Sequence, residues 1–200
     1  VKLKQKGWKS IIRAKNRKRS FNKTMKILLI NGSPRKGGNS EVLCEQFAKG
    51  ATEAGHEAEK IDLYKQKISP CVACYGCRKT QTCVIKDDMQ TVLEKMIAAD
   101  VIVLSSPVYF YSLSGQIKVM IDRCLPRYQE MKGKKFYYII TAADPQHSAA
   151  DETIAAFRGF LRCLPKAEEA GIIYGCGTWD KGDVYRHPAS EKASEMGKPV

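Results

Sequence analysis

The sequence predicts an α/β domain built on a parallel sheet with helices on both of its faces. Short apolar runs alternate with amphipathic helical patterns from Met25 onward, which is the signature of repeated strand–helix units. The run 26–31 is apolar almost throughout, as expected for a strand that is covered on both faces. A glycine-rich turn at 32–38 follows this run and leads into a helical pattern.

Two helices are defined by capping residues and buried stripes. The first is expected to begin where Asn39 or Ser40 can cap it and to end near Gly55. A later helix begins after Asp87 or Asp88, which we interpret as caps and nothing else. Their buried stripes consist of Val42, Leu43, Phe47 and Ala51 in the first helix and Met89, Val92, Leu93 and Met96 in the second.

The remaining elements follow from the same patterns. Strands are expected at 57–63, 101–105, 135–141 and 169–174, and helices at 114–124, 149–163 and 188–197. Five strand–helix units without internal repeats are typical of a flavodoxin-like three-layer sandwich whose five-stranded parallel sheet has the order 2-1-3-4-5. We therefore expect the functional site at the carboxyl ends of the strands, where this order reverses.

Basic charge is concentrated at the start of the chain. The net charge is +13, and residues 1–24 carry ten basic side chains and no acidic one, so the rest contributes 13 − 10 = +3. We expect 1–24 to be a basic leader outside the fold and 25–200 to be the domain; phosphate binding or a transit peptide are the alternatives.

No apolar run approaches the about 20 residues of a membrane span, and no secretory pattern is visible. We predict a cytoplasmic protein without a nucleic-acid or membrane partner.

The first strand leads into a loop with the donors of a phosphate site. Residues 31–40 offer two hydroxyls, a guanidinium, an amide and a glycine before a helix N-terminus, namely Ser33, Ser40, Arg35, Asn39 and Gly38. The spacing G-x-G-x-x-G is absent, and the sequence Gly37-Gly38-Asn39 lacks the lysine and hydroxyl of a P-loop. We expect this loop to bind a single terminal phosphate.

Two further loops follow strands of the predicted sheet. The first is aromatic and offers flat apolar surface to a ring; its residues are Pro107, Val108, Tyr109, Phe110 and Tyr111. The second is singled out by its location alone and contains Thr141, Ala142, Ala143 and Asp144. Both are expected to lie beside the phosphate loop.

Half of the eight cysteines lie within thirteen residues. Cys71, Cys74, Cys77 and Cys83 have a compact spacing that suits one metal centre, in the segment 70–86. An iron–sulfur cluster, a zinc ion, a redox dithiol and free thiols are the interpretations that this spacing leaves open. The other four, Cys44, Cys124, Cys163 and Cys176, are expected to pack as small apolar residues.

These motifs together resemble the NADPH-dependent FMN reductase superfamily. The resemblance rests on Met25–Arg35, on the segment from Pro70 to Met89 that holds the cysteines, and on Ser105–Tyr109 followed by Ile121-Asp-Arg123. It covers about residues 25–200 and is closest to the iron–sulfur flavoproteins.

The resemblance implies an FMN site and a metal centre. Ser33, Arg35, Asn39 and Ser40 would hold the FMN phosphate, residues 107–111 would line the isoalloxazine, and residues 141–144 would close its other side. The four clustered cysteines would bind a 4Fe–4S cluster, and the protein would be a homodimer or homotetramer.

Flavin and cluster together indicate electron transfer rather than acid–base chemistry. The sequence contains no triad and no paired catalytic carboxylates, so we predict no catalytic side chain. The expected donor is a ferredoxin-like protein or NAD(P)H, and the acceptor is a small molecule. The alternative is a cluster-free NAD(P)H-dependent reductase of flavins or quinones.

Overall fold

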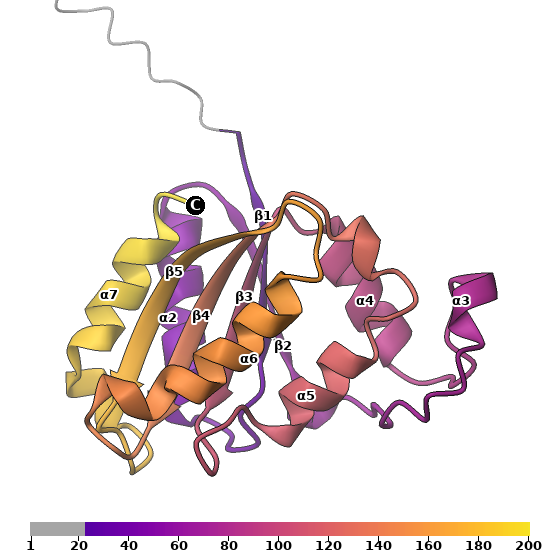
Figure 1. Ribbon diagram of the computed structural model, residues 1–200. Coiled ribbons are helices and arrows are strands. Elements are labelled where there is room, and N and C mark those ends of the chain that lie inside the picture. The colour runs from indigo at the N-terminus through magenta and orange to yellow at the C-terminus, as the bar shows by residue number, and fades with distance from the viewer. Residues whose placement is uncertain (1–22) are drawn as a thin grey trace, which may run out of the picture.

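A computed structural model describes residues 23–200, so nearly all of the expected leader lies outside the described residues. The sheet has five parallel strands in the order β2-β1-β3-β4-β5, which confirms the predicted topology (Figure 1). The strands are β1 Lys26–Asn31, β2 Glu57–Asp62, β3 Val101–Pro107, β4 Lys135–Ala142 and β5 Glu168–Cys176.

Helices form a layer on each face of the sheet. They are α2 Asn39–Glu53, α3 Cys77–Thr80, α4 Met89–Ala98, α5 Gly115–Asp122, α6 Asp151–Leu161 and α7 Pro188–Gly197. The helices α2 and α7 cover one face, whereas α4, α5 and α6 cover the other. The short helix α3 projects beyond α4 and α5 at the end of the molecule (Figure 1). None of the helices between residues 23 and 200 is both long and apolar enough to cross a membrane.

The core consists of two apolar clusters separated by the sheet. Ile27 and Leu29 of β1 pack with α2 and α7, and Leu28 and Ile30 pack with the helices of the opposite layer. Because both faces of β1 are buried, its sequence is apolar at successive positions instead of alternating. The expected stripes of α2 and α4 are buried in full.

Three local predictions were wrong. The residue that caps α2 is Gly38, and Asn39 and Ser40 are the first helical residues with side chains engaged elsewhere. Asp87 does more than bond the backbone at the start of α4, because it also forms an ion pair with Arg123. Cys163 is exposed.

The contact between α2 and α7 requires glycine at position 50. A Cβ atom there would lie 1.8 Å from the carbonyl oxygen of Ser194. We predict that Gly50→Ala lowers the free energy of unfolding by about 1–3 kcal/mol, because the backbones of the two helices would have to separate. The measurement is urea denaturation.

Gly159→Ala in α6 is the matched control. A Cβ atom there would meet only the flexible end of Arg162, at 3.8 Å. This variant should gain about 0.5–1 kcal/mol from helix propensity. A stabilised Gly50→Ala protein would contradict the close helix contact.

Candidate functional site

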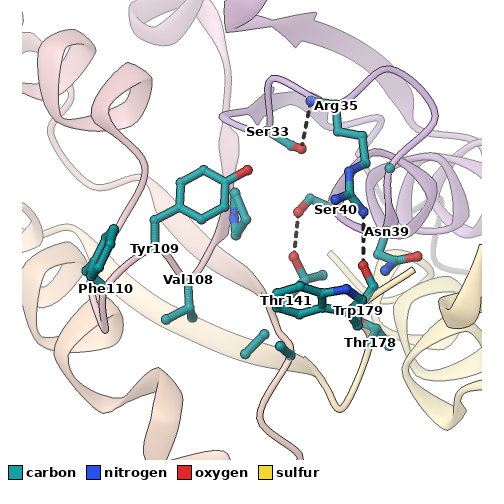
Figure 2. A pocket seen from close by; sticks show the side chains of 14 residues that line it. Ser33, Arg35, Asn39, Ser40, Val108, Tyr109, Phe110, Thr141, Thr178 and Trp179 are labelled. Atoms are coloured by element: carbon teal, nitrogen blue, oxygen red, sulfur yellow. Dashed lines mark hydrogen bonds between the residues drawn. The ribbon is translucent and has the colours of Figure 1, made fainter. Parts of the chain in front are cut away.

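A cavity of about 450 Å³ lies at the carboxyl ends of the strands (Figure 2). It brings together the residues predicted from all three loops except Tyr111 and Asp144, and it adds Thr178 and Trp179, which the prediction missed. The lining residues are Ser33, Arg35, Gly38, Asn39, Ser40, Pro107, Val108, Tyr109, Phe110, Thr141, Ala142, Ala143, Thr178 and Trp179.

The strand register explains why these loops meet. Asn31 at the end of β1 pairs with Ser105 of β3, Pro107 of β3 pairs with Thr141 of β4, and Ala142 of β4 pairs with Cys176 of β5. Four parallel strands therefore end at one edge of the sheet. Two bonds then tie the loops to one another: the N–H of Val108 donates to the carbonyl of Thr141 at 2.8 Å, and the hydroxyls of Ser40 and Thr141 are 2.6 Å apart.

The phosphate loop is held by its own hydrogen bonds. The N–H of Ser33 donates to Oδ1 of Asn31 at 3.1 Å, and the N–H of Arg35 donates to Oγ of Ser33 at 3.3 Å. The first intrahelical bond of α2 runs from the N–H of Val42 to the carbonyl of Gly38. The preceding N–H groups, which include those of Asn39 and Ser40, have no intrahelical acceptor and attract an anion at this end of the helix.

An ion-paired carboxylate, that of Glu41, holds the phosphate loop in place. Glu41 accepts from the N–H of Gly37 at 2.6 Å and pairs with Nζ of Lys60 on β2 at 2.7 Å. Burial acts to raise the pKa of Glu41, but the bonds from Lys60 and Gly37 outweigh it and lower that pKa. The carboxylate thus stays ionised beside a loop that suits an anion, and it shares Lys60 with the carboxylates of Glu45 and Asp62.

The loop that follows β5 forms the fourth wall. Nη1 of Arg35 donates to the carbonyl of Trp179 at 2.9 Å (Figure 2). Nδ2 of Asn39 donates to the carbonyl of Asp180 at 2.9 Å. Oδ1 of Asn39 accepts from the N–H groups of Gly182 and Val184. One sequence clue could have predicted this wall. Its loop directly follows the last strand, just as each of the other three loops follows a strand.

The aromatic loop is a tight turn. Tyr109 and Ser112 exchange backbone hydrogen bonds of 2.9 and 3.0 Å, and the two residues between them have φ values of 49° at Phe110 and 56° at Tyr111. Both values lie in the left-handed region that disfavours side chains with a Cβ atom. Phe110 is fully exposed at the rim of the cavity, and Tyr111 does not line it.

Asp144 also lies outside the cavity lining. Its carboxylate accepts from the N–H of Gln146 at 2.8 Å, and its carbonyl accepts from the N–H of Gly177 at 2.9 Å. These bonds fix the turn after β4, which is a structural role.

The four clustered cysteines line a second hollow of about 320 Å³, together with Asp122 and Leu125 at the end of α5. All four are free thiols, exposed or half-buried. Left-handed residues at Ala73 and Tyr75 curl the segment around this hollow. Within residues 23–200, no group of three or more Cys, His, Asp or Glu side chains has an arrangement that could hold a metal ion. The segment shares one hollow, but its sulfur atoms are not gathered at a single point.

The fold and the cavity place this protein among the flavodoxin-like α/β proteins. Its candidate phosphate site lies where the strand order of the sheet reverses. The sequence profile of the NADPH-dependent FMN reductase family matches residues 25–170, and the chain belongs to this family. The predicted family is thereby confirmed.

Two curated relatives illustrate the range of the family. An iron-sulfur flavoprotein of Methanocaldococcus jannaschii is 41% identical over 102 residues, which are 51% of this chain and 53% of the relative. A Bacillus subtilis protein, provisionally named an NAD(P)H-dependent FMN-containing oxidoreductase, is 30% identical over 188 residues, which are 87% of this chain and 97% of the relative. The chain spans about half the length of the iron-sulfur flavoproteins that it matches.

Solved structures confirm the fold. The NAD(P)H:quinone oxidoreductase from Methanothermobacter marburgensis superposes with a TM-score of 0.71 at 19% identity and covers 88% of this chain and 96% of its own. At that identity the likeness concerns the fold alone.

Asn39 is predicted to hold the fourth wall in place. Asn39→Ala removes one donor and one acceptor that together make three bonds to residues 180–184, so it should cost about 1.5–4 kcal/mol of unfolding free energy. Hydrogen exchange at the amides of Gly182 and Val184 should accelerate. Asn39→Asp keeps the acceptor and should protect these two amides; unchanged exchange in the alanine variant would contradict this role.

Proposed function

We propose that this protein is an FMN-dependent oxidoreductase and that the cavity at the strand ends holds one FMN. The observation that carries this proposal is the one-phosphate loop, which opens into a cavity whose other walls are largely apolar. A volume of about 450 Å³ lies within the range of cofactor pockets, about 300–1,000 Å³. The family to which the chain belongs supports the same cofactor.

The phosphate is assigned to the first turn of α2 and the loop before it. Ser33, Ser40 and the N–H groups after Gly38 would donate to it, together with Asn39 and Arg35. One N–H of the Arg35 guanidinium is engaged by Trp179, which leaves four of its five donors for an anion. These residues fit a terminal phosphate. The loop lacks the glycine spacing G-x-G-x-x-G, which lets a backbone approach a pyrophosphate closely, so it offers no pyrophosphate site.

The ring is assigned to the space between the aromatic loop and the loop after β4. Pro107, Val108, Tyr109 and Phe110 form one wall, and residues 141–143 form another. Thr178 and Trp179 join the proposed site, whereas Tyr111 and Asp144, which do not line the cavity, leave it.

Bound FMN supplies two-electron hydride chemistry and one-electron chemistry. This chain contributes binding, orientation and exclusion of water, because the cavity lining contains no histidine and no carboxylate. NAD(P)H and a small-molecule acceptor are the proposed partners at the open side near Phe110.

We further propose that Cys71, Cys74, Cys77 and Cys83 hold a 4Fe–4S cluster. Four thiols around one hollow are the donor set that such a cluster needs, and similarity to iron-sulfur flavoproteins supports it; the segment would close around the cluster to bring the four sulfur atoms together. A cluster would accept electrons singly, and a ferredoxin-like protein would then be the donor. The alternative is a cluster-free NAD(P)H-dependent reductase of FMN or quinones, favoured by the Bacillus subtilis relative that matches 87% of this chain.

The proposed assembly is a homodimer or homotetramer in the cytoplasm. Apolar side chains of the cysteine segment and of the aromatic loop are exposed, among them Val72, Val84 and Phe110. Burial of these side chains against a second copy would remove them from water.

FMN binding is predicted to depend on Arg35. Arg35→Ala should weaken FMN by about 1.5–3 kcal/mol, the range for hydrogen bonds to charged groups, which is about 10- to 150-fold in Kd. The measurement is a titration of flavin fluorescence, and mass spectrometry of the released cofactor should show FMN rather than FAD. Lys36→Ala removes the neighbouring charge, which does not line the cavity, and should have a small effect. Equal losses in the two variants would indicate a diffuse charge effect in place of a phosphate contact.

Iron binding is predicted to depend on Cys77 and FMN binding to be independent of it. Cys77→Ser should abolish iron in anaerobically purified protein, because a cluster needs four thiolates, while the phosphate loop remains intact. Iron analysis and the absorption spectrum are the measurements. Cys163→Ser, which changes an exposed cysteine outside the segment, is the control and should keep wild-type iron. Retained iron in Cys77→Ser would overturn the ligand assignment.

A further inference from the structure

A buried arginine lies beneath the cysteine segment. Arg123 directly follows α5, and its side chain is 1% exposed. Nη1 donates to the carbonyl of Ser69 at 2.6 Å and to Oδ2 of Asp87 at 2.8 Å, whereas Nη2 donates to Oδ1 of Asp87 at 2.9 Å. Burial of this charge is tolerated because the carboxylate meets the guanidinium with two parallel bonds.

The partners of Arg123 flank the cysteine segment on both sides. Ser69 lies two residues before Cys71, and Asp87 lies four residues after Cys83. The Asp87 carboxylate also accepts from the N–H of Ser69 at 2.9 Å, so it binds both the arginine and the start of the segment. Outside this base, every residue of the range 70–86 is exposed or half-buried. The Arg123–Asp87 pair is therefore one point at which the two ends of the segment are joined, and two bonds between Lys67 and Asp88 lie next to it.

One donor of Arg123 is not used by this base. Among residues 23–200, its Nε is buried and has no hydrogen-bond partner, and a buried donor in this state costs about 1–3 kcal/mol. Arg123 and Cys83 line the same small hollow of about 50 Å³. The carboxylate of Asp87 raises the pKa of Arg123 most, burial acts to lower it, and the sulfur of Cys83 adds a smaller raising effect.

We propose that Arg123 is the positioning residue of the cysteine site: it closes the base of the segment through Asp87 and offers its Nε–H to the sulfur of Cys83. The second part rests on the proposed metal-binding function of the quartet. Asp87 balances the formal charge of Arg123. Any influence of Arg123 on the sulfur of Cys83 would therefore come from the proposed N–H···S bond and not from a net positive charge. Such a bond favours the more negative, reduced state of a cluster.

Arg123→Lys is the test variant, since it keeps the charge but loses Nε and the forked geometry. Arg127→Lys is the matched control, because Arg127 lines the same hollow but pairs with Glu130. Two rates are measured in metal-free protein: cleavage within residues 70–86 by a dilute protease, and alkylation of Cys83. Both should rise on the order of tenfold in Arg123→Lys and stay at the wild-type rate in Arg127→Lys. Asp87→Asn should act in the same direction, and FMN binding identifies variants that remain folded. Wild-type cleavage and alkylation rates in folded Arg123→Lys and Asp87→Asn would overturn the closure of the segment.

In anaerobically loaded protein, Arg123→Lys should release iron to a chelator faster, on the order of 10- to 100-fold, the usual effect of losing a bond to a metal ligand. The midpoint potential of the cluster should shift to more negative values. An unchanged potential would overturn the bond to Cys83. A wild-type protein that binds no iron would refute the proposed cluster and with it this bond, whereas the proteolysis and alkylation rates would still decide whether Arg123 closes the segment.

Discussion

The parallel pairing of β1 with β3 at the centre of the sheet is the constraint on which the candidate site depends. The N–H of Gly32, just beyond β1, donates to the carbonyl of Ser105 at 2.8 Å, and the carbonyl of Gly32 accepts from Oγ of Ser114 at 2.9 Å. A Cβ atom at Gly32 would lie 2.2 Å from Cγ1 of Ile117, so the chain leaves β1 in direct contact with α5. Only glycine permits this approach, and it fixes where the phosphate loop begins relative to the aromatic loop.

Arg35 and Asn39 each serve two parts of the site. Their side chains line the cavity and also donate to carbonyl oxygens of Trp179 and Asp180, which lie about 140 residues further along the chain. A ligand bound by the four remaining Arg35 donors would share this side chain with the wall that contains Trp179, whereas Asn39 also holds that wall through the N–H groups of Gly182 and Val184. Ligand binding is therefore coupled to the position of this wall, because Arg35 and Asn39 belong to both.

Periodicity and turn chemistry predicted most of the fold because both are local. The buried run of β1 and the stripes of α2 and α4 were readable for that reason, and the sheet order followed from the count of strand–helix units. The contacts that were missed join distant segments. Nothing near Asp87 indicates that its carboxylate faces Arg123, 36 residues away, and the helix cap was the simpler local interpretation. Tyr111 and Asp144 were included as members of the two loops that follow β3 and β4, but a left-handed turn and an Asx-type bond direct them elsewhere.

Helix α5 connects the two candidate sites. Ser114 at its start bonds to the phosphate loop, and Arg123 at its end holds the base of the cysteine segment. A helix rises about 1.5 Å per residue, so these two attachment points are about 14 Å apart along its axis. Ile117 and Met120 are buried in the core between them, which makes this helix a rigid spacer. Within one chain the separation between the proposed flavin and the proposed cluster thus depends on this packed helix, and a change that shifts α5 would alter both sites together even though they share no lining residue.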